Sequence, residues 1–127
     1  MPALMSFEET LKRYETGENA FDLTIEKWER IRETIASAHS TSQFIMIARG
    51  ASIKVALCIE FHDACHLCPL ETTCQPGTEG PFYKVMRLLQ AYCLAGDILP
   101  HSILLNQVDQ LIEDLTAKNE AYKKLRH

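Results

Sequence analysis

The chain has 127 residues, a formal net charge of -4 and 46% hydrophobic residues. These values are typical of one soluble globular domain, so we expect a single helical domain over residues 1–127. The charge balance lacks the basic excess that marks most nucleic-acid-binding domains. No apolar run approaches the ~18 residues of a membrane span, and the first residues lack an export-signal pattern. We therefore expect a cytoplasmic protein that contacts no membrane.

The first half of the chain predicts three helices. Ser6 and Glu9 form a capping-box pattern that starts a short helix, and Gly17 ends it. Thr24 is the expected N-cap of a second helix, whose apolar residues recur at helical spacing. These are Ile25, Trp28, Ile31 and Ile35, with Glu26, Lys27, Glu29, Arg30 and Arg32 off the stripe. A central helix is expected over residues 43–61, because this stretch is apolar nearly all round, which is typical of a buried element.

The second half of the chain predicts two more helices. Pro81 suits the first position of one, and Gly96 suits its end. Its Cys93 has no partner at metal-ligand spacing, so we expect a small buried thiol. The last helix spans about 101–125, with apolar residues in a coiled-coil-like alternation that only Lys118 interrupts. We expect an all-α compact bundle of about five helices, whose C-terminal helix packs within the chain or binds a protein partner or a second copy.

The most informative segment is a metal-binding loop expected at residues 58–80, between the central helix and the fourth helix. It contains Cys58, Cys65, Cys68 and Cys74 at the spacing C-x6-C-x2-C-x5-C. Thiolates this close repel one another unless a shared cation binds them. Four Cys suit either tetrahedral zinc or a [4Fe–4S] cluster. Zinc ribbons usually present two short Cys pairs, whereas this loop has one pair flanked by single Cys, so the spacing favours the cluster and leaves zinc as the alternative.

Other side chains of this loop modify these two predictions. His62 or His66 could replace one Cys at a zinc site, although with four Cys present we expect them to hydrogen-bond or to be exposed. Glu60, Asp63 and Glu71 would place negative charge beside an anionic cluster, which favours its oxidised state and lowers its reduction potential. Five Cys without an export signal argue against disulfides.

The Cys spacing resembles the iron–sulfur cluster loop of the endonuclease III and adenine DNA glycosylase family. The segment from Cys65 to Cys74, with a Pro after the third Cys, is especially similar to the glycosylase version. That family binds a [4Fe–4S] cluster with these four Cys, so the resemblance implies Cys58, Cys65, Cys68 and Cys74 as ligands. It covers seventeen of 127 residues. The chain has no Gly-rich hairpin like that family's, and residues 59–64, basic in the family, include two acids here. The resemblance therefore does not extend to glycosylase activity.

A second likeness is to small uncharacterised phage and microbial proteins with a Cys-x-x-Cys-Pro pattern and a later Pro-aromatic pair. Cys68-Pro69 and Pro81-Phe82 match this pattern, which implies no activity. We expect a small [4Fe–4S] protein whose cluster is structural or redox-active and which acts through a partner. The alternatives are a zinc-stabilised adaptor and a nucleic-acid-binding module, for which Lys84 and Arg87 would contact phosphate. The sequence shows no catalytic triad or phosphate loop, so we assign no enzymatic activity.

Overall fold

The computed structural model describes residues 4–62, 64, 67–74 and 80–125, and throughout these residues the regular structure is helical, without a strand. The helices are α1 (Phe7–Glu15), α2 (Ala20–Ser37), α3 (Thr41–Ala51), α4 (Ala56–Glu60), α5 (Glu71–Cys74), α6 (Pro81–Ala95) and α7 (His101–Leu125). The predicted all-α class is confirmed. The predicted count of about five helices is wrong, because the central helix is broken in two and the Cys segment contains the short helix α5.

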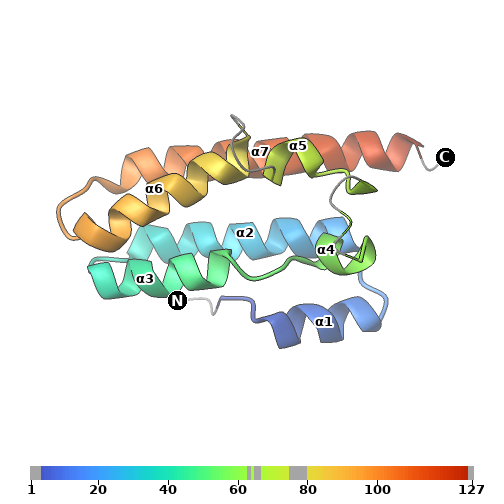
Figure 1. The fold of residues 1–127 in the computed structure, drawn as a ribbon, viewed down its shortest axis with the longest axis horizontal. Helices are drawn as coiled ribbons and strands as arrows, with labels where there is room; N and C mark the ends of the chain where they lie inside the picture. The colour runs from blue at the N-terminus through green and yellow to red at the C-terminus, as the bar shows by residue number, and fades with distance from the viewer. Residues whose placement is uncertain (1–3, 63, 65–66, 75–79, 126–127) are drawn as a thin grey trace.

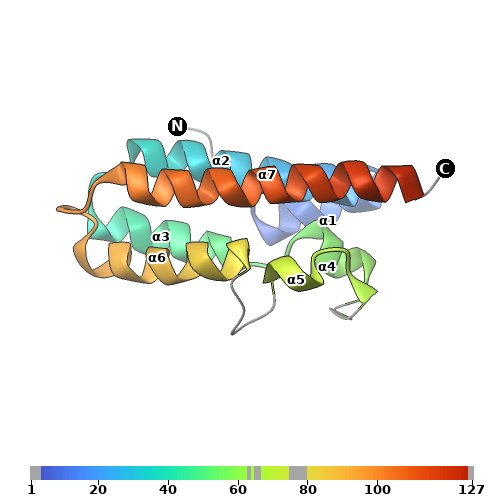
Figure 2. The same cartoon turned by 90° about the horizontal axis from the view of Figure 1, so that it is seen from above.

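The helices form two layers (Figures 1 and 2). The long helices α2 and α7 pack side by side in opposite directions and make one layer. In the other layer, α3 and α6 pack against each other and cover one half of the α2/α7 pair, while α4 and α5 lie along the other half. Helix α1 packs against α2 and α4. The short helices α4 and α5 thus lie where two longer helices would continue the layer formed by α3 and α6.

The first two helices start at polar caps. Ser6 accepts a hydrogen bond from the amide of Glu9 at 3.0 Å, and Gly17 follows the helix with a φ of +102°. The predicted start at Ser6 and stop at Gly17 are confirmed. The Glu9 carboxylate, expected to close the capping box, contacts Arg13 and Arg30 instead. The predicted N-cap of the second helix is wrong: Asn19 caps α2, and Thr24 lies buried inside it with its hydroxyl donating to the carbonyl of Ala20. The reason is that the apolar stripe already begins at the buried Ala20, upstream of the stripe that we predicted.

The predicted continuous helix over 43–61 is also wrong. Helix α3 ends at Ala51, and α4 begins at Ala56 after a short turn. The turn forms because the Ser52 hydroxyl donates to the Arg49 carbonyl and the Ile53 amide to the Gly50 carbonyl, a tighter pattern than the helical one. Nor is α3 buried all round, because Ile45 and Met46 are 38% and 63% exposed.

One stretch bears on the expectation of no membrane contact. By length and composition alone, Thr41–Glu60 is apolar enough to cross a membrane, contrary to our estimate from its shorter apolar runs. Core helices of soluble proteins pass the same test, and here α3 packs against α6 and α2 while α4 packs against α2 and α1. The absence of membrane contact stays a prediction.

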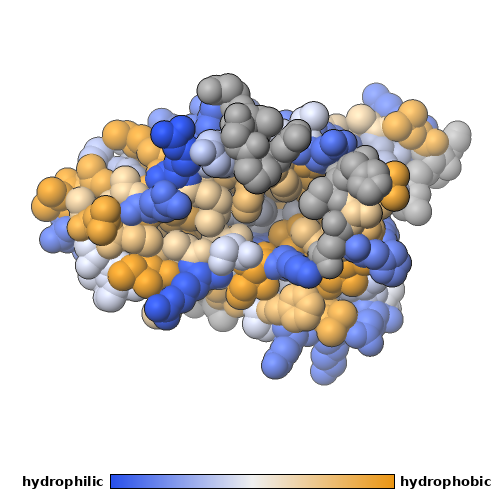
Figure 3. Space-filling model, viewed as in Figure 1, coloured by the Kyte–Doolittle hydropathy of each residue, from blue (hydrophilic) through white to orange (hydrophobic). Residues whose placement is uncertain are grey.

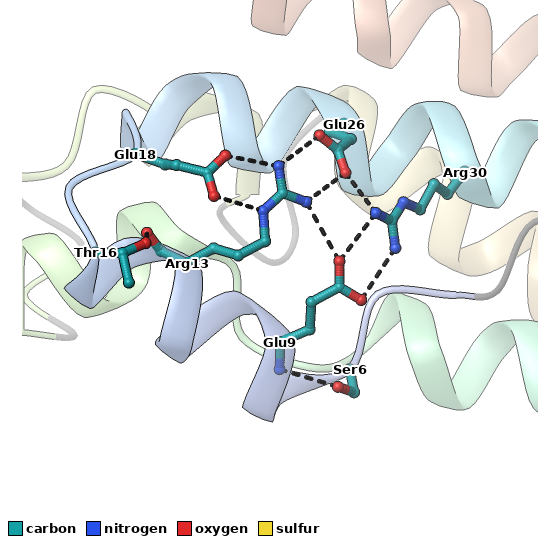
Figure 4. Close-up of polar contacts among 7 residues, drawn as sticks. All are labelled: Ser6, Glu9, Arg13, Thr16, Glu18, Glu26 and Arg30. Carbon is teal, nitrogen blue, oxygen red and sulfur yellow. Dashed lines mark hydrogen bonds and ion pairs between the residues drawn. The ribbon is translucent and has the colours of Figure 1, made fainter.

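A charged network fastens α1 to α2 (Figure 4). Arg13 donates to both carboxylate oxygens of Glu18, each at 2.7 Å, and to those of Glu26 at 2.5 and 2.9 Å. Arg30 contacts Glu9 at 2.9 Å and Glu26 at 2.6 Å. The hydrogen bonds from Arg13 hold the pKa of Glu18 and of Glu26 below the ordinary value. This network places α1 over the start of α2, next to α4.

The last two helices form as predicted. Pro81 is the first residue of α6, and Gly96 follows its last residue, Ala95. In the first half of α7, the predicted seam is buried within the chain through Leu104, Val108, Leu111 and Leu115. Further along, Asn119 is buried and donates to Asp22 at 3.3 Å, whereas Leu125 is 84% exposed. The helix thus packs within the chain along most of its length and leaves its last turn exposed.

Candidate metal centre

Three of the four predicted ligands lie in described residues, and each comes from a different local structure. Cys58 lies in the middle of α4, Cys74 is the last residue of α5, and Cys68 lies in the turn before α5. All three are half-buried. Cys65 lies outside the described residues.

These three cysteines line one cavity. It has a volume of about 50 Å³ and lies between α4, α5 and the segment that joins them. Apart from the Cys residues and Glu71, its wall is apolar: Val55, Phe61, Ala64 and Leu70. The topology therefore brings Cys58 next to residues that follow it by ten and sixteen positions, as the metal-loop prediction requires.

The described residues do not by themselves form a metal site. Among residues 4–62, 64, 67–74 and 80–125, no three His, Cys, Asp or Glu side chains converge closely enough to hold a metal ion. The predicted fourth ligand, Cys65, and one of the alternative zinc ligands, His66, are outside this set. The assignment of the ligands and of the metal thus stays a prediction.

The turn at Cys68 offers a hydrogen bond to sulfur. The amide of Leu70 donates to Cys68 Sγ at 3.4 Å, and the Glu71 amide donates to the Cys68 carbonyl at 3.1 Å. Pro69 has no amide hydrogen, so the next amide, that of Leu70, is the one that reaches the sulfur. Leu70 is 3% exposed, which anchors the turn in the core. N–H···S bonds of this kind stabilise thiolate ligands and raise the potential of a cluster that they hold.

Helix α5 is anchored to α7 by a polar cluster that sequence reasoning missed. Thr73 is fully buried and donates to Asp114 Oδ2 at 2.6 Å. Lys118 donates to Thr72 Oγ1 at 3.0 Å and to Thr73 Oγ1, and it pairs with Asp114 at 3.1 Å. The signal for this cluster was the one residue out of place in the apolar alternation of the last helix. Lys118 interrupts that seam because it faces α5, and the cluster fixes the residue next to Cys74.

A second, larger cavity adjoins the first. It has a volume of about 170 Å³ and shares Val55, Cys58, Leu70 and Cys74 with the smaller cavity. It reaches Trp28 on α2 and Phe82 on α6, whose rings meet edge to face at 5.9 Å between centroids. Cys58 and Cys74 thus line both cavities.

The structure corrects the placement of Lys27, which the sequence pattern put off the apolar stripe. Lys27 is 2% exposed, and its ammonium group donates to the carbonyl of Ile53 in the turn between α3 and α4. Burial lowers the pKa of Lys27 to about 8, while Cys58 acts on that pKa in the opposite direction. The signal was present in the sequence, because Lys27 lies four residues after Leu23 and four before Ile31, both buried on the same face.

The other candidate residues lie around this site or away from it. His62 is exposed and has a positive φ of 52°, while Glu71 is exposed at the wall of the smaller cavity. Asp63 is outside the described residues. Cys93 lies elsewhere, on α6, half-buried with its thiol 3.6 Å from the Phe44 carbonyl, and burial raises its pKa.

Lys84 and Arg87, predicted as phosphate contacts in the nucleic-acid alternative, lie on α6. The Arg87 guanidinium stacks over the Tyr83 ring at 5.6 Å from its centroid. Nothing in this arrangement favours phosphate over other partners.

Comparison with known proteins identifies no relative of this chain. No family model, no curated protein and no solved structure matches the chain. The case for the site therefore rests on the Cys spacing and on the geometry described above.

Proposed function

We propose that this chain is a small helical protein that binds one [4Fe–4S] cluster through Cys58, Cys65, Cys68 and Cys74. The observation that carries the proposal is that Cys58, Cys68 and Cys74 all line one small, mostly apolar cavity. An apolar wall of this kind keeps water away from iron–thiolate bonds.

The residues around the cavity support such a centre in three ways. The Leu70 amide donates to a ligand sulfur, the polar cluster of Thr73, Asp114 and Lys118 holds α5 in place, and apolar side chains limit access of water. A bound cluster would supply either a one-electron redox couple or a cross-link between α4 and α5. The cluster acts with a partner protein, and the exposed last turn of α7 around Leu125 is the candidate contact.

Anaerobic purification followed by metal analysis tests the proposal. We expect a brown protein that absorbs near ~400 nm and contains about four irons and about four sulfides per chain. Replacing Cys58 with Ser should remove most of the iron, whereas the same change at Cys93, which is outside the motif, should leave it in place. A colourless wild-type protein without iron or sulfide would contradict the proposal.

Zinc held by the same four Cys is the alternative, because a closed tetrahedral site needs the same convergence of thiolates. The same assay separates the two, since about one zinc and no sulfide per chain would identify the zinc site. The nucleic-acid alternative would show as duplex-DNA binding that weakens steeply with salt.

A further inference from the structure

A buried cation lies next to the proposed centre. Lys27 is 2% exposed, and α2, which carries it, packs against α4, which carries Cys58. Ile53, whose carbonyl accepts a hydrogen bond from Lys27, lines the same cavity as Cys58 and Cys74, which brings the ammonium group to the border of that cavity. A negative charge on Cys58 favours the ammonium form of Lys27. Lysine is rarely buried to this degree unless an anion or a set of acceptors offsets the loss of water.

The hydrogen bonds of Lys27 do not account for its burial. An ammonium group has three donors, and the described contact is with a single acceptor, the Ile53 carbonyl. Burial accordingly destabilises the charged form, which lowers the pKa of Lys27 to about 8. The hydrogen bond to Ile53 thus ties the ammonium group to the turn between α3 and α4, which borders the larger cavity.

We propose that Lys27 is a built-in counter-cation of the metal–thiolate centre, and that it raises the reduction potential of that centre. This inference rests on the proposed function. Four thiolates around a [4Fe–4S] core leave a net negative charge in both redox states, and the reduced state carries one more negative charge. A fixed positive charge nearby therefore stabilises the reduced state more than the oxidised state. Lys27 is a positioning and charge-compensating residue and not a ligand.

Lys27 opposes the nearby acids. Glu71 lines the smaller cavity, and together with Glu60 it adds negative charge on the outer side of the site. Those carboxylates are exposed or half-buried and are screened by water, whereas Lys27 is enclosed by protein. A buried charge is screened less than an exposed one. We therefore expect Lys27 to change the reduction potential of the centre more than Glu60 or Glu71 does.

Three substitutions at this position separate charge from hydrogen bonding. Lys27→Gln removes the charge and keeps a donor for the Ile53 carbonyl, Lys27→Met removes both, and Lys27→Arg keeps both. The exposed Lys12 on α1, changed to Gln, controls for a loss of net charge alone. Each anaerobically purified protein is assayed for iron, sulfide and zinc and then titrated to its midpoint potential.

We expect the Gln and Met variants to hold the cluster with a lower midpoint potential. At the wild-type midpoint, their ratio of reduced to oxidised cluster should fall on the order of tenfold, which for a one-electron couple corresponds to about 59 mV. Lys27→Arg and Lys12→Gln should stay near the wild type. A role confined to the Ile53 carbonyl would leave the potential of Lys27→Gln unchanged, and that result would overturn the inference while the cluster remained.

The outcomes for the two proposals can be told apart. A wild-type protein without iron and sulfide refutes the cluster regardless of Lys27. If it contains zinc, the counter-cation is tested by competition with a chelator, where Lys27→Gln should lose zinc more readily than Lys12→Gln, and equal loss would refute it. A protein that binds neither metal overturns both proposals.

Discussion

The two halves of the α2/α7 pair are covered in different ways. Over one half, α3 and α6 form regular helices of 11 and 15 residues whose inner side chains, among them Phe44 and Tyr92, are essentially inaccessible. Over the other half lie α4 and α5, with five and four residues, and two adjoining cavities of about 50 and 170 Å³. The first half therefore has the longer helices and the more deeply buried side chains.

The difference explains where the cysteines are. A helix of one turn is not stable by itself and depends on tertiary contacts. In the α4/α5 half, those contacts are the buried Leu57 and Leu70, the polar cluster at Thr73, and the thiols around the smaller cavity. A metal centre there would replace the hydrophobic contacts that longer helices supply in the other half. On the outside, Ile45, Met46 and Leu94 of α3 and α6 are exposed. Figure 3 shows apolar residues over both halves of the face that it presents.

The largest expected effect is that of removing a ligand. Serine at Cys58 or Cys74 should lower the iron content on the order of tenfold or more, because both thiols line the shared cavity. The melting temperature of the purified protein should fall with it. The same change at Cys93 in the α3/α6 half should alter neither quantity. Equal iron in the Cys58 and Cys93 variants would contradict the division between the halves.

Overpacking the α3/α6 half should destabilise the protein whether or not metal is bound. A Cβ added at Gly96 would lie 2.3 Å from Phe44 Cδ2 and 2.6 Å from the Tyr92 carbonyl oxygen. Gly96→Ala should therefore lower the free energy of unfolding by about 1–3 kcal/mol, measured by denaturant titration of both metal-free and loaded protein.

Gly50→Ala is the matched control, because its nearest atom at 3.1 Å is the end of the flexible Leu4 side chain. In that position, inside α3, alanine should be neutral or stabilising by up to about 1 kcal/mol. A stability loss for Gly96→Ala that appeared only in metal-free protein would show that the two halves are not independent.

Loosening α5 should have an intermediate effect on the α4/α5 half. Thr73→Val keeps the shape of the side chain but leaves Asp114 and Lys118 without the buried hydroxyl, which should lower stability by about 1–2 kcal/mol. We also expect faster loss of iron to a chelator, since Thr73 adjoins Cys74. Thr116, an exposed threonine of α7 whose hydroxyl donates to the Ile112 carbonyl of its own helix, is the control. Thr116→Val should lose iron at nearly the wild-type rate, and equal rates for both variants would contradict the anchoring role.

The smallest expected effect concerns the network on α1. The hydrogen bond from Arg13 depresses the pKa of Glu26 below its ordinary value of 4.5. The resulting stabilisation is present above about that pH and disappears as the pH falls through the lower pKa of the folded state. Glu26→Gln should thus flatten the acid limb of the stability curve by less than about 1 kcal/mol. Loaded and metal-free protein should show the same flattening, because the network lies on the outer side of α2.

Local signals in the sequence predicted part of the fold. Ser6, Gly17, Pro81 and Gly96 mark helix ends at the predicted positions: Ser6 through its side-chain hydroxyl, Gly17 through a positive φ and Pro81 through its fixed φ. The break after Ala51 could not be predicted in this way, because Ser52 and Ile53 end α3 with hydrogen bonds that an intact helix would forgo.

The site was predictable to a similar extent. The Cys spacing indicated that the thiols would meet, and three of them do line one cavity. The Cys spacing could not predict two hydrogen bonds between distant parts of the chain. Lys27 donates to the carbonyl of Ile53, 26 positions away, and Lys118 donates to the hydroxyl of Thr73, 45 positions away. Both lysines lie at apolar positions of their helices, so a charged residue within a buried stripe was the available signal for a functional contact.

The comparison between the halves is tested most directly by amide hydrogen exchange on the anaerobically purified protein before and after its metal is stripped. We predict that stripping speeds exchange in α4 and α5 while exchange in α3 and α6 stays the same, because only the first pair depends on the centre. Unchanged protection of α4 and α5 after complete removal of the metal would contradict the claim that a bound centre completes this half of the bundle.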